Sequence, residues 1–319
     1  MDKRTWMSIA GLSLVLAACG KASPQPIRLP MGYIPNVQYA PFYLADGEGY
    51  FEEAGLDIEF DYSLETDAVA RVGAGETPFG LASGEQVLLA RAHGIPVVYV
   101  LAWFQDFPVA VASPAGSGIR QPQDLTGKRI GIPGLFGASY IGYRALLRAA
   151  GMPEDAAALE AIGFNQVEAL LAGQLDGVVV YANNEPIQLE ARGMPVDLIR
   201  VADYVDLASN GLIANEDTLA SDPELVRSMV RAVVRGLEAT LADPEAAFAV
   251  AGRYVPGLAE SGADVQREVL QASLGFWEAE RIGWSSPEAW ANMEAVLLAM
   301  GLLPGPVDAG SAFTNEFVP

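Results

Sequence analysis

The sequence alternates between short apolar runs and segments of helical periodicity, and this alternation starts twice. It begins near residue 27, stops near residue 112 and then restarts. Strands separated by helices in this way form open α/β sheets. The chain is therefore expected to be an α/β protein with two open α/β units. The predicted strands are 27–31, 56–62, 79–81 and 97–103, followed by 109–113, 129–133, 177–181 and 198–202.

The second unit is predicted to be inserted into the first. A strand over 210–215 leads back to the first unit, and the chain after it is helical. Asp222-Pro223 and Asp243-Pro244 each place an N-cap Asp before Pro, which marks a helix start. Two lobes joined by two crossovers form a hinged clamshell with a cleft between them. Lobe 1 is predicted over 28–112 plus 205–319, with the helical C-terminal part packed on it, and lobe 2 over 113–204, with crossovers near Ala112 and Leu207.

The N-terminus has the pattern of an export signal. Lys3 and Arg4 precede an apolar stretch over 6–18, which is too short to span a bilayer of ~30 Å. Small residues followed by Cys19 resemble a bacterial lipobox, in which the cysteine is lipidated after cleavage. We predict a signal peptide over 1–18, lipidated Cys19 with a tether over 19–27, and attachment to the extracytoplasmic face of the cell membrane (the periplasmic side if an outer membrane exists). An ordinary signal peptide, with Cys19 as a bystander, is the alternative.

The composition excludes several classes of function. The 19 Lys+Arg residues face 40 Asp+Glu residues, for a net charge of −21, so a nucleic-acid partner is not expected. The single histidine, His93, and the single cysteine, Cys19, remove most metal-site and catalytic-triad chemistry. We therefore expect no metal, no cofactor and no enzyme activity.

Ligands of open α/β sheets bind beyond the carboxyl ends of strands, beside helix N-termini, and four segments fall there. The first contains Asn36, Gln38, Tyr39 and Tyr43, whose amides and phenols suit a flat ring with a polar edge. The alternative for each tyrosine is a place in the core of a helix, with Asn36 forming a turn. Which aromatic faces the cleft depends on a helix phase that the sequence leaves open.

The second and third segments are helix starts. Ser83 and Gln86 have the spacing of a capping box, which explains them without a ligand, although a hydroxyl there also suits a cleft. The loop formed by Gly137, Ala138, Ser139 and Tyr140 lets a ligand approach backbone N–H groups. Glycine is common in such loops, so this signal is weak by itself.

The fourth segment contains Tyr181, Asn183, Asn184 and Glu185. Asn184 is expected to cap the next helix, whereas Asn183 and Glu185 are not needed for capping. The Glu185 carboxylate can accept hydrogen bonds from a ring N–H or amino group. Trp103 lies at the end of the predicted strand over 97–103 and is either a cleft-wall residue or part of a surface loop.

Three stretches of the sequence resemble a bacterial family of solute-binding proteins. They are 32–57, with Gly-Tyr-Ile-Pro-Asn at its start, 124–131 and 169–177. The family serves ABC importers of sulfonates and thiamine precursors and shares its fold with fungal pyrimidine synthases. The resemblance implies a periplasmic-binding-protein clamshell of type II-like topology, a small-molecule ligand, no catalysis, and ABC permease and ATPase subunits as partners. We expect the protein to be a monomer.

Within this family, Pro35-Asn36 is similar to the branch that binds thiamine pyrimidine precursors, and 183–186 is similar to a riboflavin-binding relative. Riboflavin is therefore the favoured ligand, and a formylaminopyrimidine is the first alternative. A sulfonate is the second, but it usually needs a cation, and Arg71 and Arg91 are the basic residues between 30 and 112. A pyrimidine-synthesis enzyme is the third. The fungal synthases use a histidine as cofactor donor and a cysteine-rich motif, from which this chain departs.

Overall fold

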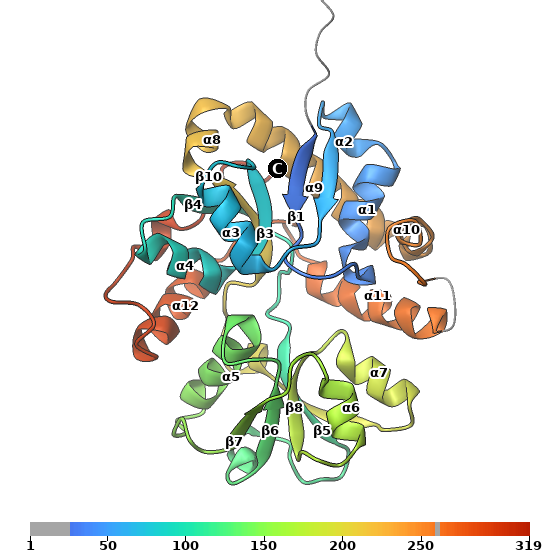
Figure 1. Ribbon diagram of the computed structural model, residues 1–319, viewed down its shortest axis with the longest axis vertical. Coiled ribbons are helices and arrows are strands. Elements are labelled where there is room, and N and C mark those ends of the chain that lie inside the picture. Colours follow the sequence, from blue (N-terminus) through green and yellow to red (C-terminus); the bar gives the residue numbers. More distant parts are fainter. Residues whose placement is uncertain (1–25, 259–261) are drawn as a thin grey trace, which may run out of the picture.

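The computed structural model describes residues 26–258 and 262–319, which form two lobes stacked along the long axis of the molecule (Figure 1). The predicted signal peptide and Cys19 lie outside the described residues. The first strand begins at Ile27, where the tether was expected to end. No helix in the described part of the chain combines the length and apolar character needed to cross a membrane.

Lobe 1, the upper lobe in Figure 1, contains two small sheets. In the first, β1 (Ile27–Pro30) pairs in parallel with β2 (Ile58–Asp61). In the second, β10 (Asn210–Asn215) lies between β3 (Phe79–Ser83) and β4 (Val97–Ala102) and is antiparallel to both. Because β1 lies beside β3, the sheets meet edge to edge. The predicted strand–helix alternation is present, but its strands are divided between two sheets.

Lobe 2 is built on one five-stranded sheet in the order β7-β6-β8-β5-β9. Strands β6 (Arg129–Ile132), β7 (Ala158–Ala161) and β8 (Gly177–Tyr181) are parallel. Strand β5 (Val109–Pro114) runs antiparallel to β8 and to β9 (Val196–Arg200). The sequence predicted four of these five strands, and β7 was missed because its residues, Ala-Leu-Glu-Ala, form no apolar run.

The predicted boundary between residues 112 and 113 is wrong, because it falls inside β5. This strand pairs with β8 and β9 and so belongs to lobe 2. The first crossover is consequently 103–108, between β4 and β5, and the second is 204–209, which includes Leu207. An apolar strand has the same sequence pattern in either sheet, so its partner could not be identified from that pattern. Lobe 1 hereafter means β1–β4 and everything from β10 onward, and lobe 2 means 109–203.

Twelve α-helices and four 3-10 helices cover the sheets in the described residues. In lobe 1 they are η1 (Val37–Tyr39), α1 (Ala40–Gly47), α2 (Tyr50–Glu53), α3 (Glu65–Gly73), α4 (Gly84–Ala92), α8 (Glu216–Ser221), α9 (Pro223–Ala242), α10 (Pro244–Ala251), α11 (Ala263–Trp277), α12 (Pro287–Ala299) and η4 (Ala309–Ser311). In lobe 2 they are η2 (Pro122–Leu125), α5 (Gly137–Ala149), α6 (Gln166–Leu171), α7 (Glu185–Ala191) and η3 (Val201–Asp203).

The C-terminal helices complete lobe 1 as predicted, with α9 and α10 packed on α1 (Figure 1). Asp222 and Asp243 are confirmed as N-caps, because their carboxylates accept from the backbone amides of Leu225 and Ala246. Helix α9 buries one face against the core, and each buried aliphatic side chain there contributes about 1.5–3 kcal/mol. Its buried face includes Val226, Met229, Val230, Val233 and Leu237.

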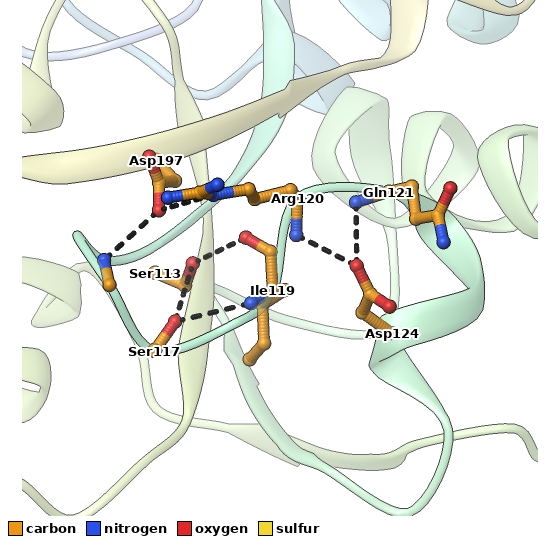
Figure 2. Close-up of polar contacts among 8 residues, drawn as sticks. Ser113, Ser117, Ile119, Arg120, Gln121, Asp124 and Asp197 are labelled. Atoms are coloured by element: carbon orange, nitrogen blue, oxygen red, sulfur yellow. Dashed lines mark hydrogen bonds and ion pairs between the residues drawn. The ribbon is translucent and has the colours of Figure 1, made fainter.

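Polar contacts hold the connection from β5 to β6 in lobe 2 (Figure 2). The backbone amides of Arg120 and Gln121 donate to one carboxylate oxygen of Asp124, at 3.0 and 3.1 Å. The same two amides, that of Arg120 first, lower the pKa of Asp124. Arg120 also pairs with Asp197 on β9, 3.5 Å away. These contacts attach the loop to the edge of the sheet.

Candidate functional site

A cavity of about 210 Å³ lies between the two lobes, and both lobes line it. Ten of the fourteen side chains or loop residues predicted for a ligand site are in its wall. They are Asn36, Gln38, Tyr39 and Gln86 from lobe 1, and Gly137, Ala138, Ser139, Tyr181, Asn184 and Glu185 from lobe 2. The segments expected at the carboxyl ends of strands therefore do meet at one place.

Aromatic side chains form the lobe 1 part of the wall. Trp103, in the first crossover, stacks on Tyr39 with ring centroids 5.1 Å apart and an interplanar angle of 25°. Phe104 packs edge-on against Trp103 at 4.8 Å. The Tyr39 hydroxyl donates to the Met31 carbonyl at 2.7 Å, which holds the ring in place. Trp103 is therefore a wall residue, as one of its two sequence interpretations expects.

Two tyrosines predicted for the site do not line the cavity. Tyr43 is fully buried in lobe 1, where it stacks on Tyr254 at 4.6 Å and its hydroxyl bonds to that of Tyr62. Tyr140 instead accepts a hydrogen bond from the guanidinium of Arg144, one turn along α5. Helix phase decides both cases, because only one face of each helix can point toward the cavity.

Ser83 is also absent from the wall, and its predicted capping role is wrong. It is the N-cap residue of α4, but its side chain makes no capping hydrogen bond. Its hydroxyl oxygen lies 2.7 Å from a carboxyl oxygen of Glu65 and 2.5 Å from one of Glu85. Glu65 lines the cavity, so Ser83 lies directly behind a wall residue.

Asn183 joins the lobes rather than facing the cavity. Its side chain is fully buried, and its amide donates to Gln38 on η1 and to Ser273 on α11, both at 2.8 Å. These partners are in lobe 1, whereas Asn183 follows β8 of lobe 2. A second polar contact between the lobes runs from the Tyr181 hydroxyl to the Asn210 side chain at 3.1 Å.

Glu185 is held by its own turn. Its carboxylate accepts from the Tyr181 backbone amide at 2.9 Å and from the Asn184 side chain at 3.1 Å. Asn184 makes no side-chain cap, contrary to prediction, because its oxygen accepts from Gln188 instead. Burial raises the pKa of Glu185, and the hydrogen bond from the Tyr181 amide partly opposes this rise.

Sequence analysis missed the acidic residue on the opposite side of the cavity, Glu65. Helix α3 begins at Glu65, whose carboxyl accepts from Asn210 at 3.0 Å and from Ser83. Burial raises the pKa of Glu65. Burial, together with the charge of Glu65, raises the pKa of the neighbouring Glu85 to about 8. No local motif marks Glu65 as a site residue, because its hydrogen-bond partners Ser83 and Asn210 are remote in sequence.

Large apolar side chains surround the open side of the cavity. Phe136 is 70% exposed, Phe164 is 62% exposed and Leu64 is 57% exposed, and all three line the cavity. Tyr33 of lobe 1 packs edge-on against Phe164 of lobe 2 at 5.2 Å. None of these four was among the predicted site residues. Leu64 and Phe164 lie at a helix end and in a loop without a motif, Phe136 directly precedes the predicted loop, and Tyr33 lies in the Gly-Tyr-Ile-Pro-Asn stretch that carried only the family resemblance.

The wall carries negative and neutral polar groups. Glu65 and Glu185 line it, and no Lys or Arg is among the described residues that do. His93 lies at the C-terminal end of α4 and outside the wall. The described residues contain no group of three or more His, Cys, Asp or Glu arranged to hold a metal ion. The arrangement suits a flat ligand that stacks on aromatics and offers hydrogen-bond donors.

Comparisons with known proteins find relatives over most of the chain. The model of the family described as "NMT1/THI5 like" matches residues 36–247. The riboflavin-binding protein RibY of Chloroflexus aurantiacus is 40% identical over 95% of this chain and 91% of its own length. The formylaminopyrimidine-binding protein of Halalkalibacterium halodurans is 26% identical over 91% of this chain and 90% of its own. A 4-amino-5-hydroxymethyl-2-methylpyrimidine phosphate synthase of Aspergillus parasiticus is 28% identical over 88% of this chain and 83% of its own.

A solved structure shows the fold. The periplasmic aliphatic sulphonate binding protein SsuA of Escherichia coli superposes with a TM-score of 0.75. The superposition covers 91% of this chain and 97% of that one, at 15% sequence identity. The expected periplasmic-binding-protein fold is thereby confirmed.

Proposed function

The chain belongs to the NMT1/THI5-like family, and on that premise we propose that it is the solute-binding protein of an ABC importer for riboflavin. It captures the flat ring in the cavity between its lobes and passes it to permease and ATPase subunits. The observation that carries this proposal is the cavity wall, in which stacked aromatics of lobe 1 oppose the hydrogen-bonding side chains of Tyr181, Asn184 and Glu185.

The similarity to RibY over nearly the whole chain supports riboflavin as the ligand. A formylaminopyrimidine is the second candidate, supported by the relative from H. halodurans. Both ligands are flat heterocycles with N–H groups along an edge, which fits a wall that contains two carboxyls. A sulfonate is disfavoured because the described wall residues include no cation to pair with it.

The protein acts in this proposal by binding, without catalysis. The synthase relative is 28% identical, and the fungal synthases are enzymes. The one histidine of this chain lies outside the cavity wall, so it cannot serve there as a donor to a bound ligand. Turnover of a pyrimidine or a flavin by the purified protein would contradict the proposal.

Attachment to the membrane through Cys19 is part of the same proposal. The pattern of small residues before Cys19 supports it, and an importer's binding protein must stay on the extracytoplasmic side. We expect Cys19→Ala to move the protein from the membrane fraction to the soluble fraction of an expressing bacterium. Unchanged fractionation, together with an unlipidated N-terminus by mass spectrometry, would contradict lipidation of Cys19.

The ligand is tested by titrating riboflavin into the chain that starts at residue 20, after unfolding and refolding to strip any carried molecule. Saturable quenching of flavin emission is expected, because stacking on Tyr39 and Trp103 places electron-rich rings against the flavin. Without quenching, the formylaminopyrimidine is titrated next by calorimetry.

The role of Glu185 is tested in the same titration. Glu185→Ala is expected to weaken binding by more than ~1 kcal/mol, because it removes a charged acceptor from the wall. Glu190→Ala is the matched control, since Glu190 is an exposed residue of the same helix. Equal riboflavin affinity of the two variants would show that Glu185 does not contribute to ligand binding.

A further inference from the structure

Behind the lobe 1 wall, two carboxyls meet one hydroxyl. The Ser83 oxygen is within hydrogen-bond distance of both Glu65 and Glu85. A serine hydroxyl has a single hydrogen, so it can donate to one carboxyl only. The other carboxyl must carry its own proton and donate to the serine oxygen. The geometry therefore requires one proton on this pair of acids.

The surroundings of the two carboxyls decide which one is charged. Glu65 also receives the Asn210 amide, and Ser83 and Asn210 are register partners on β3 and β10, so both donors are held by the sheet. Glu85 is fully buried, and its second carboxyl oxygen has no partner among the described residues. A charge is stable where donors converge and costly where none is present.

Donors converge on Glu65 from both sides. The Tyr181 hydroxyl of lobe 2 donates to the Asn210 oxygen, and the Asn210 amide donates to Glu65. On the other side, a protonated Glu85 donates to Ser83, which donates to Glu65. Either placement of the proton makes every bond in this chain, but a negative charge on Glu65 lies where the donors converge, whereas one on Glu85 leaves a buried charged oxygen without a partner among the described residues.

We propose that Glu65 is a specificity-determining residue of the cavity, kept as a single carboxylate by a proton on Glu85, and that it selects uncharged heterocycles with an N–H donor over phosphorylated or sulfonated ones. This rests on the proposed function, since it concerns the ligand of the same cavity. Glu85 is a positioning residue, because it acts on the ligand only through Ser83 and Glu65.

A second observation points to a ligand at this wall. Trp103 lines the cavity, and its buried indole N–H has no acceptor among the described residues. Buried polar groups in proteins are nearly always paired, so this unpaired N–H on a wall residue favours a ligand that carries an acceptor. The ligand class is thus a heterocycle with a donor for Glu65 and an acceptor for Trp103, which describes the carbonyl and N–H edge of a flavin or a pyrimidine.

Among the residues that the structure describes, no Lys or Arg offsets the charge of the two acids. On the helices that carry Glu65 and Glu85, Arg71 pairs with Asp61 and Arg91 pairs with Glu216. The titratable groups that face the pair from η1, β4 and β8 are the phenols of Tyr39, Tyr99 and Tyr181, respectively. Burial raises the pKa of each phenol, so all three stay neutral while Glu85 titrates. The raised pKa of Glu85 agrees with its bound proton at neutral pH.

The first test compares riboflavin with its 5′-phosphate ester by flavin quenching near neutral pH. The wild-type protein is expected to bind the ester about tenfold or more weakly, because like charges brought together in a desolvated site repel strongly. Glu65→Gln should reduce the ratio of the two dissociation constants, ester over riboflavin, severalfold. Asp67→Asn, which removes an exposed charge from the same helix, should leave this ratio unchanged. A ratio unaffected by Glu65→Gln, or equal binding of both flavins by the wild type, would overturn the proposal.

The second test is a pH profile of riboflavin binding. Ionisation of Glu85 removes the donor to Ser83 and adds a second charge, so wild-type affinity should fall several-fold between about pH 7 and about pH 9. Glu85→Gln keeps a donor that cannot ionise and should hold the neutral-pH affinity across this range. Any effect of the flavin's own ionisation on binding is the same for both proteins and therefore cancels in the comparison. Identical profiles would show that Glu85 does not control the site.

A ligand-free measurement separates this proposal from the choice of ligand. Infrared spectra near neutral pH should contain the C=O stretch of a protonated carboxylic acid, lost in Glu85→Gln and kept in Asp67→Asn. If the wild type binds neither flavin, the proposed ligand is wrong, and this band alone then tests whether Glu85 carries the proton. A spectrum unchanged by Glu85→Gln would overturn it.

Discussion

On the lobe 1 side of the cavity the two stacked aromatic side chains are buried, whereas on the lobe 2 side the largest aromatic side chains are exposed. Trp103 and Tyr39 are each 5% exposed, and Phe136 and Phe164 are 70% and 62% exposed. The two sides also differ in their hydrogen bonds. Glu65 accepts from a residue 145 positions away, whereas Glu185 accepts from backbone and side chain within its own turn.

This difference indicates how a ligand is held. The lobe 1 side is rigid before any ligand arrives, because its aromatics are packed and its polar groups are paired across strands. The lobe 2 side contributes local loops whose aromatic side chains have few packing partners. A ligand that stacks on lobe 1 gives Phe136 and Phe164 the apolar surface that they lack. Four measurements test this difference between the two sides of the cavity.

The largest effect is expected for Trp103→Ala. Removing a buried indole from the aromatic cluster of lobe 1 should lower the free energy of unfolding by about 3–5 kcal/mol. Phe136→Ala should change it by less than about 0.5 kcal/mol, because the side chain is already exposed. Urea denaturation measures both. A similar loss in the two variants would mean that the two sides are not built differently.

Ser83→Ala tests the polar part of lobe 1. It removes the hydroxyl between two buried carboxyls, and the free energy of unfolding should fall by about 2–3 kcal/mol near neutral pH. Ser139→Ala is the matched change on the lobe 2 side and should cost less than about 0.5 kcal/mol. Should Ser83→Ala prove as mild as its control, the hydroxyl does not hold the acids together.

Asn183→Ala probes the contact that joins the two sides. The variant leaves Gln38 and Ser273 without their buried donor, so unfolding should become easier by about 1–2 kcal/mol. Dissociation of riboflavin, followed by stopped-flow fluorescence, should also become faster. Asn165→Ala is the control, because Asn165 is exposed and bonds only within lobe 2. Unchanged stability and unchanged dissociation would show that this contact does not hold the lobes.

The smallest effect is the pH dependence of stability in the ligand-free protein. Folding raises the pKa of Glu85 from 4.5 to about 8, so its contribution is complete below pH 4.5 and is lost as the pH rises toward 8. The free energy of unfolding of the wild type should therefore fall by at least about 1 kcal/mol relative to Glu85→Gln between pH 5 and about 8. Parallel stability curves would contradict a buried proton on Glu85.

The sequence predicted the fold through local signals. Asp222 and Asp243 cap their helices because the acceptor and the donor amides are three residues apart. The same reasoning failed for Ser83 and Asn184, which have the residue types of caps but bond to other side chains. A capping side chain adopts its local bond unless a stronger partner is nearby, and that partner is often remote in the chain.

The site was predicted where a motif was compact and missed where it was dispersed. The 181–185 segment and the 137–139 loop were found because their polar or small residues are consecutive. Glu65 was missed because its role depends on Ser83 and Asn210, which only the pairing of β3 with β10 brings beside it. Tyr39 and Tyr43 have equal sequence support, and packing against Trp103 or Tyr254 separated them.

Sequence alone was enough to predict the two α/β units, the insertion of one into the other and the segments that meet at the cleft. These follow from hydrophobic periodicity and short-range hydrogen bonds, which act between residues close in the chain. Contacts between remote parts of the chain set the sheet that β5 joins, the tyrosine that lines the cavity and the pairing of Glu65 with Ser83 and Asn210. Each of these depends on strand register and burial, which contacts between remote residues control.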